Sequence, residues 1–137
     1  MQTFAYALTP FVAWLIAGSL KFVINSLRAK QAAYHLIGYG GFPSNHSAIV
    51  SSTATLIALR EGIASPAFGV AVSLAFNVTL DANSLRRQVG LHAQRLNQLD
   101  AEQKNKPLRE RMGHSPVEIA GGLVTGMLAA LLVNHLP

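Results

Sequence analysis

Two short motifs, each placed just before an apolar segment, contain the residues best suited to chemistry. The first reads GGFPSNHS at residues 40–47, and the second reads GHSPVE at residues 113–118. Glycine and proline before a helix leave backbone N–H groups free to bind an anion, and the helix N-terminus adds the positive end of its dipole. Each motif is also typical of a plain capped helix start. The histidine in each motif, however, favours a site that binds and transforms an anion.

The two histidines have different neighbours in the sequence. Glu118 follows His114 by four residues, which is one helical turn, so its carboxylate can orient the imidazole and stabilise its charged form. His46 follows Ser44 and Asn45 and has no acidic residue nearby. Two histidines in one site can supply one nucleophile and one general acid.

Cations accompany these motifs along the chain. Lys21 and Arg28 precede the first motif, and Arg86 and Arg87 lie between the two. A pocket of lysine, arginine and helix N-termini suits a phosphate group, which has several oxyanions to satisfy. Metal ligation is the competing use of histidine, but the acidic and histidine ligands are few and lie among cations, and the chain has no cysteine. We therefore predict an anion site that uses no metal and no cofactor.

The elements that position these motifs are predicted to be membrane helices. Half of the 137 residues are hydrophobic, 12% are charged and the mean hydropathy is +0.32, whereas about 25% of residues are charged in soluble domains. Residues 4–20 contain no charge and can extend to Leu27 if Lys21 snorkels, and residues 117–136 carry one acidic residue. Both stretches can span a bilayer. The chain is expected to form a single membrane-embedded domain, residues 1–137.

The remaining segments are less regular. Residues 48–59 and 63–80 are apolar but shorter as helices than the ~30 Å hydrocarbon core, so we expect a tilted or incomplete hairpin. From Ser84 to Leu99 apolar residues alternate four and three apart, which indicates an amphipathic helix outside the membrane, and residues 100–107 are typical of a surface loop. We predict an all-α integral membrane helical bundle of about four membrane helices plus an amphipathic cytoplasmic helix. The alternative, a soluble α-bundle, is disfavoured by the uncharged first segment.

The basic residues predict the orientation of the chain. In a four-span topology ten of the eleven Lys and Arg residues fall on or near the side of the 28–45 and 81–115 loops, and only Arg60 falls on the other. The positive-inside rule places those loops in the cytoplasm and both termini outside. We expect a protein integral to the cell (inner) membrane with its site facing the cytoplasm. Because topology accounts for most of the net charge of +5, nucleic acid is not predicted as a partner.

Taken in order along the chain, the motifs resemble those of the type 2 phosphatidic acid phosphatase and vanadium haloperoxidase superfamily. That superfamily has K-x6-RP, then PSGH, then SR-x5-H-x3-D, and this chain has Lys21-x6-Arg28, PSNH at residues 43–46 and His114-x3-Glu118. It is most similar to a small divergent membrane branch, whose GG-x-PS-x-HSA, D-A-x3-RR and GH-[ST]-P-x-E occur here as GGFPSNHSA, DANSLRR and GHSPVE. The resemblance covers essentially the whole chain.

This resemblance implies roles for individual residues. His114 would attack phosphorus to form a phosphohistidine, with Glu118 in the place of the family's aspartate, and His46 would protonate the leaving oxygen. The phosphate would be held by the cations Lys21 and Arg28, by the hydroxyl of Ser44 and by the backbone near Asn45. Water would then complete the hydrolysis without a metal.

The chain departs from the superfamily pattern at three positions. Ala29 replaces the proline of the first motif, Asn45 replaces the glycine of the second, and Leu108 stands where the third has arginine. Three residues could supply the missing cation, and the sequence does not choose among them: Arg86, Arg87 and Arg109.

The sequence therefore predicts a membrane phosphatase that hydrolyses a lipid phosphate monoester, such as phosphatidylglycerophosphate or phosphatidate. The alternative is a catalytically silent membrane protein that keeps an anion-binding pocket, and a vanadate-dependent haloperoxidase suits a membrane-embedded chain less well. We expect membrane lipid to surround the helices of the chain. Gly122 and Gly126 have the spacing of close helix packing, either within the chain or in a homo-oligomer.

Overall fold

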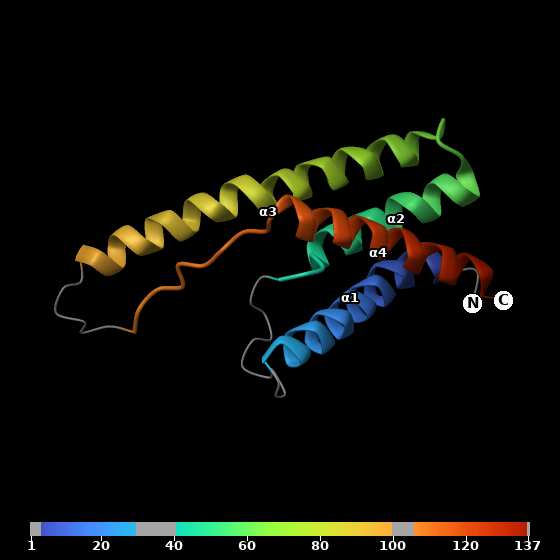
Figure 1. The fold of residues 1–137 in the computed structure, drawn as a ribbon. Coiled ribbons are helices and arrows are strands. Elements are labelled where there is room, and N and C mark those ends of the chain that lie inside the picture. Colours follow the sequence, from blue (N-terminus) through green and yellow to red (C-terminus); the bar gives the residue numbers. More distant parts are fainter. Residues whose placement is uncertain (1–3, 30–40, 100–105, 137) are drawn as a thin grey trace.

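The computed structural model describes residues 4–29, 41–99 and 106–136. Four α-helices make up most of these ranges, and no strand occurs within them. The helices, labelled in Figure 1, are α1 (Ala5–Ala29), α2 (Asn45–Glu61), α3 (Pro66–Leu99) and α4 (Pro116–His135). The predicted all-α fold is confirmed.

Three of these helices are long and apolar enough to cross a membrane. They are α1 over Ala5–Leu27, α3 and α4. The remaining helix, α2, has 17 residues and lies in the middle of the bundle, where it packs against each of the other three. It corresponds to the short segment predicted at 48–59. Because its neighbours cover it, α2 need not present a long apolar surface to lipid.

The central helix α2 buries hydroxyl side chains as well as apolar ones. Ser51 Oγ donates to the carbonyl oxygens of Ala48 at 3.3 Å and Leu123 at 3.1 Å, and Ser52 Oγ donates to Ile49 O at 2.8 Å. Each hydroxyl thus finds an acceptor on the backbone, which removes most of the cost of burying it. Serine is also small, so helices can approach closely around α2.

The helices approach α2 most closely at two glycines of α4. A Cβ atom at Gly122 would overlap the carbonyl oxygen of Ser44, and one at Gly126 would overlap the carbonyl oxygen of Ala48. The spacing noted in the sequence therefore packs α4 onto α2 within one chain. A homo-oligomer stays a prediction, because these two glycines are already covered.

Helix α3 is longer than the sequence pattern predicted. Its 34 residues run without a break through Asp81, Ala82 and Asn83, so the predicted division into a span and a separate amphipathic helix is wrong. None of these three residues is proline or glycine, and the change from apolar to polar composition alters the surroundings of the helix without ending it. Residues 82–99, here called the arm, extend beyond the rest of the bundle (Figure 1).

The chain returns along the arm in an extended segment, residues 106–113. Asn97 holds this return segment with its side-chain amide: Oδ1 accepts from Leu108 N and Nδ2 donates to Leu108 O, both at 2.8 Å. Gly90 admits the backbone of Glu110, which a Cβ atom there would overlap. Of the loop predicted at 100–107, residues 100–105 lie outside the described residues, and 106–107 belong to no helix.

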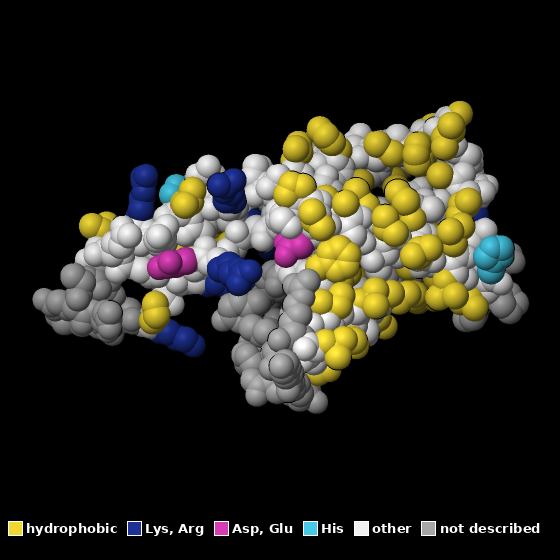
Figure 2. Space-filling model, viewed as in Figure 1, with side chains coloured by type: hydrophobic (Ala, Val, Ile, Leu, Met, Phe, Trp, Pro, Cys, Tyr) yellow, Lys and Arg dark blue, Asp and Glu magenta, His cyan; other side chains and the backbone are white. Residues whose placement is uncertain are grey.

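The two ends of the molecule differ in composition. The termini and the turn between α2 and α3 lie at one end, and the arm and the starts of α2 and α4 lie toward the other (Figure 1). Figure 2 shows hydrophobic side chains over the bundle and lysine and arginine side chains over the arm. At the first end, Arg60 Nε donates to Asn134 Oδ1 at 3.0 Å and the guanidinium lies over the ring of Tyr6.

Candidate active site

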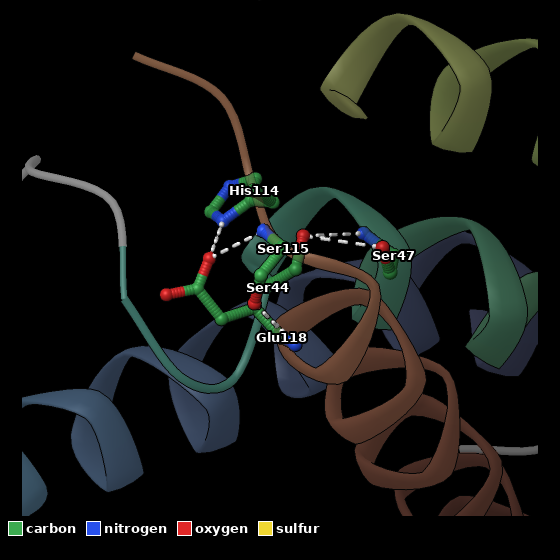
Figure 3. Close-up of polar contacts among 5 residues, drawn as sticks. All are labelled: Ser44, Ser47, His114, Ser115 and Glu118. Carbon is green, nitrogen blue, oxygen red and sulfur yellow. Dashed lines mark hydrogen bonds and ion pairs between the residues drawn. The ribbon is translucent and has the colours of Figure 1, made fainter. Parts of the chain in front are cut away.

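The starts of α2 and α4 lie side by side and are joined through their backbones. Ser44 N donates to Glu118 O at 2.9 Å. Ser44 is the N-cap of α2, and its buried Oγ accepts from Ser47 N at 3.4 Å and from Ser47 Oγ at 3.1 Å (Figure 3). The capping interpretation of the first motif is thus confirmed, and the contact of Ser44 with phosphate stays a prediction.

The second motif forms a capping box that also orients a histidine. Glu118 N donates to Ser115 Oγ at 3.2 Å, and Ser115 N donates to Glu118 Oε2 at 2.9 Å. The same carboxylate oxygen lies 3.2 Å from His114 Nδ1 (Figure 3). Because a carboxylate only accepts, the neutral imidazole carries its proton on Nδ1. His114 Nε2 therefore keeps a free lone pair.

The backbone of His114 is fixed by the arm. His114 N donates to Ala82 O at 2.9 Å, and Gly113, with φ of +94°, makes the turn that brings it there. A Cβ atom at Gly113 would also lie 3.3 Å from Arg87 N. Sequence reasoning did not find this contact of the return segment with α3, and Gly90 and Gly113 are the signals that could have suggested it.

The charged neighbour of His46 is a cation, whereas that of His114 is a carboxylate. Arg86 Nη2 lies 3.0 Å from His46 Nε2, and since a guanidinium only donates, Nε2 is the acceptor in this bond. The neutral His46 ring therefore carries its proton on Nδ1. The rings of His46 and His114 are 6.0 Å apart between centroids and tilted by 56°.

Burial and nearby positive charges lower the pKa of both histidines. Burial lowers the pKa of His46, and the positive charges of Arg86, a protonated His114 and Lys21 lower it further. Burial also lowers the pKa of His114, and Lys21 adds to this, while the hydrogen bond to Glu118 opposes it. Both imidazoles are therefore more readily neutral than a free histidine, whose pKa is about 6.5.

The remaining candidate residues fall into two groups. Half-buried Lys21 of α1 lies near enough to both histidines to affect their titration, and half-buried Asn45 is the first residue of α2. Arg28 lies in the last turn of α1, but its side chain is outside the described residues.

Among the three arginines left open by the sequence, Arg86 is the one that contacts a site histidine. Arg87 is exposed, and exposed Arg109 donates through Nε to Arg111 O at 3.2 Å. Leu108, at the position of the superfamily arginine, is bound by Asn97 on the arm. The arginine that contacts a site histidine thus comes from α3 and not from the segment before the second motif.

Within the described residues no group of three or more His, Asp or Glu side chains could hold a metal ion. The site instead combines two imidazoles, one carboxylate and at least two cations at the start of two helices. This combination can bind an anion and transfer a proton or a phosphoryl group.

The helical membrane bundle and its paired histidine motifs define a membrane protein of the type 2 phosphatidic acid phosphatase (PAP2) kind. The chain belongs to the Divergent PAP2 family, whose model matches residues 4–129. It is similar to the uncharacterized membrane protein YuiD of Bacillus subtilis (strain 168), with 30% identity in an alignment 146 positions long that covers 93% of this chain and 92% of the relative. No solved structure matches the chain significantly.

Proposed function

We propose that this protein hydrolyses a lipid phosphate monoester through a phosphohistidine, without a metal ion. The observation that carries the proposal is the opposite hydrogen bonding of two adjacent histidines. His114 donates to Glu118 and keeps a nucleophilic Nε2, whereas His46 lies against Arg86, a cation suited to phosphate. Membership of the Divergent PAP2 family supports phosphate chemistry as the class of reaction.

In the first step His114 Nε2 attacks phosphorus, and the bond from phosphorus to the lipid oxygen breaks. His46 gives its proton to that oxygen, so the lipid leaves as a neutral alcohol. In the second step water attacks the phosphohistidine, His46 accepts a proton from the water, and inorganic phosphate leaves. Glu118 stabilises the positive ring of His114 throughout.

Arg86 occupies the atom of His46 that the proposed mechanism uses. His46 Nε2 accepts from Arg86 in the free protein, so it carries no proton that could go to the leaving oxygen. An in-line arrangement needs about 3–3.5 Å from the nucleophile to phosphorus and about 2.8 Å from the leaving oxygen to the acid. In the proposed mechanism Arg86 therefore turns from His46 to the phosphate oxygens when substrate binds, which frees Nε2 of His46.

The same movement adjusts the charge of the acid. In the free protein Arg86 contributes to the lowered pKa of His46. A phosphate dianion beside the ring, paired with Arg86 and Lys21, raises that pKa again because it favours the protonated imidazole. Substrate binding thus loads the proton that the first step needs. The family resemblance implies that Arg28 and Ser44 also bind the phosphate, and exposed Arg87 attracts the anion from a greater distance.

The site faces the cytoplasm, in the inner membrane, because the basic residues gather at its end of the molecule. Since the chain has no cysteine, single cysteines report sidedness directly. Gln98→Cys lies on the arm and Ala64→Cys in the turn between α2 and α3, and both positions are exposed. An impermeant thiol reagent applied to intact cells should label Ala64→Cys alone. Labelling of Gln98→Cys alone would reverse the orientation.

Phosphate release by the purified protein tests the proposed function. Lipid phosphates presented in detergent micelles should lose phosphate in a reaction that vanadate inhibits and EDTA does not. A protein that binds vanadate but releases no phosphate from any lipid would be the catalytically silent alternative. Loss of activity in EDTA that returns with a divalent metal would contradict the metal-independent mechanism.

A further inference from the structure

Asn45 occupies the position where the superfamily motif has glycine, immediately before His46. Its side chain points toward α1: Nδ2 lies 3.9 Å from the place of a Cβ atom at Gly18. Gly18 precedes Lys21 by three residues, a rise of about 4.5 Å along the helix, on the side of the membrane interior. The carboxamide of Asn45 therefore lies on the lipid side of the phosphate-binding lysine.

Two polar atoms in this first turn of α2 are buried and have no hydrogen-bond partner among the residues that the structure describes, namely Asn45 Oδ1 and His46 Nδ1. Buried polar atoms are nearly always paired, and leaving one unpaired costs about 1–3 kcal/mol. The two atoms are opposite in kind. Asn45 Oδ1 accepts, whereas His46 Nδ1 donates in the neutral ring, because Arg86 occupies Nε2 as a donor.

A phosphate group satisfies only one of these two atoms. The oxygens of the phosphate dianion, the form that the proposed mechanism binds, only accept, so they can pair with His46 Nδ1 but not with Asn45 Oδ1. A donor must come from the part of the substrate that joins the phosphate to the lipid. Ester carbonyls of a diacylglycerol only accept, and a prenyl chain offers neither kind of group. An ammonium group would donate, but Lys21 and Arg86 repel it.

We propose that the substrate carries a free hydroxyl group close to its phosphoester bond and that Asn45 recognises this hydroxyl. The inference rests on the proposed phosphatase activity and adds the chemical class of the leaving group. The hydroxyl donates to Asn45 Oδ1 on the lipid side of the phosphate. Such a site rejects an analogue without the hydroxyl, because the buried acceptor then stays unpaired.

The test compares two lipids that differ by one oxygen. Oleoyl lysophosphatidate has a free hydroxyl on the glycerol carbon next to the phosphorylated carbon, and oleoyl propanediol phosphate lacks it. Both are assayed in mixed micelles at equal surface fraction. The protein should release phosphate from the hydroxyl lipid with a kcat/KM about 10–100-fold higher. Asn45→Gly, which restores the superfamily motif, should bring this ratio close to one, whereas Asn45→Asp should keep a preference because it keeps an acceptor.

The outcomes separate this inference from the proposed function. Release of phosphate from both lipids at equal kcat/KM would contradict the recognition of a hydroxyl and leave the phosphatase activity standing. A preference that survives unchanged in Asn45→Gly would contradict the role of Asn45. No release from either lipid would contradict the proposed function and this inference with it.

Discussion

His46 and His114 lie 6.0 Å apart between ring centroids, yet their surroundings are opposite in charge. The nearest charged partner of His114 is the carboxylate of Glu118, and that of His46 is the guanidinium of Arg86. A carboxylate stabilises the positive ring of a phosphohistidine, and a cation beside an imidazole keeps that ring neutral until the cation is drawn to the phosphate. The difference teaches that in the proposed mechanism the partners, and not the residue type, assign the nucleophile and the acid.

The two partners also reach their histidines in different ways. Glu118 lies four residues from His114 and forms part of the same helix cap, so a short stretch of sequence determines the pair. Arg86 lies 40 residues from His46 and depends on α3 continuing past residue 81. The surroundings of the proposed nucleophile are thus determined locally, whereas those of the proposed acid are determined by the packing of the arm.

Removal of the proposed nucleophile, His114, should have the largest effect. His114→Ala leaves no group to accept the phosphoryl, so turnover should fall at least about 10⁴-fold, to the background rate. The matched control is His92→Ala, which removes an exposed histidine of the arm and should keep the parent rate. Steady-state phosphate release from a lipid phosphate measures both. Substantial turnover by His114→Ala would remove His114 from the mechanism.

Removal of the proposed acid, His46, should have the next largest effect, and the size of this effect should depend on the leaving group. His46→Ala should slow hydrolysis of a lipid phosphate by roughly 10²–10⁴-fold, the usual contribution of general acid catalysis. With p-nitrophenyl phosphate the loss should be much smaller, because that leaving group needs no proton. An equal loss for both substrates would assign His46 to binding instead of proton transfer.

Arg86→Gln should lower kcat/KM by about 10²-fold, the usual cost of losing one group that stabilises transition-state charge. It should also shift the pH profile. The protonated acid is lost as pH rises through the pKa of His46, and Arg86 helps to hold that pKa low. Without Arg86 the alkaline limb of kcat/KM should move to higher pH. Exposed Arg87→Gln is the control, and an equal shift in both variants would argue against a specific pair.

The smallest effect is expected for Glu118→Gln. Glutamine can still accept from His114 Nδ1 and Ser115 N but lacks the charge, so kcat should fall about tenfold, the difference between a charged and a neutral hydrogen bond. Ser115→Ala removes the other half of the helix cap, at a cost of about 1 kcal/mol in stability. If the loss of activity in both variants followed the fall in their melting temperatures, Glu118 would act only as part of the helix cap.

The sequence was sufficient for the parts of the fold that depend on local patterns. Long apolar runs predicted α1 and α4, and the two motifs, each typical of a capped helix start, marked the starts of α2 and α4. The continuity of α3 was missed because a change from apolar to polar residues near Asp81 marks the end of the apolar surroundings, while helix propensity there stays adequate.

The choice between neighbouring arginines could not come from sequence. Arg86 and Arg87 point in directions about 100° apart on one helix, since 3.6 residues make a turn. Which of them contacts His46 depends on the rotation of α3 against α2, and that is set by long-range packing. The amide of Asn97, which holds the return segment, depends in the same way on a path through space that no local motif encodes.

Trapping the phosphoenzyme tests the central claim most directly. Purified protein mixed with a lipid phosphate labelled with ³²P and quenched within milliseconds should carry label that is lost in acid and stable in base, as a phosphohistidine is. The label should be absent from His114→Ala and should form slowly in His46→Ala. Label that persists in His114→Ala and vanishes in His46→Ala would reverse the two roles, and an active protein that never carries label would replace the phosphohistidine with direct attack by water.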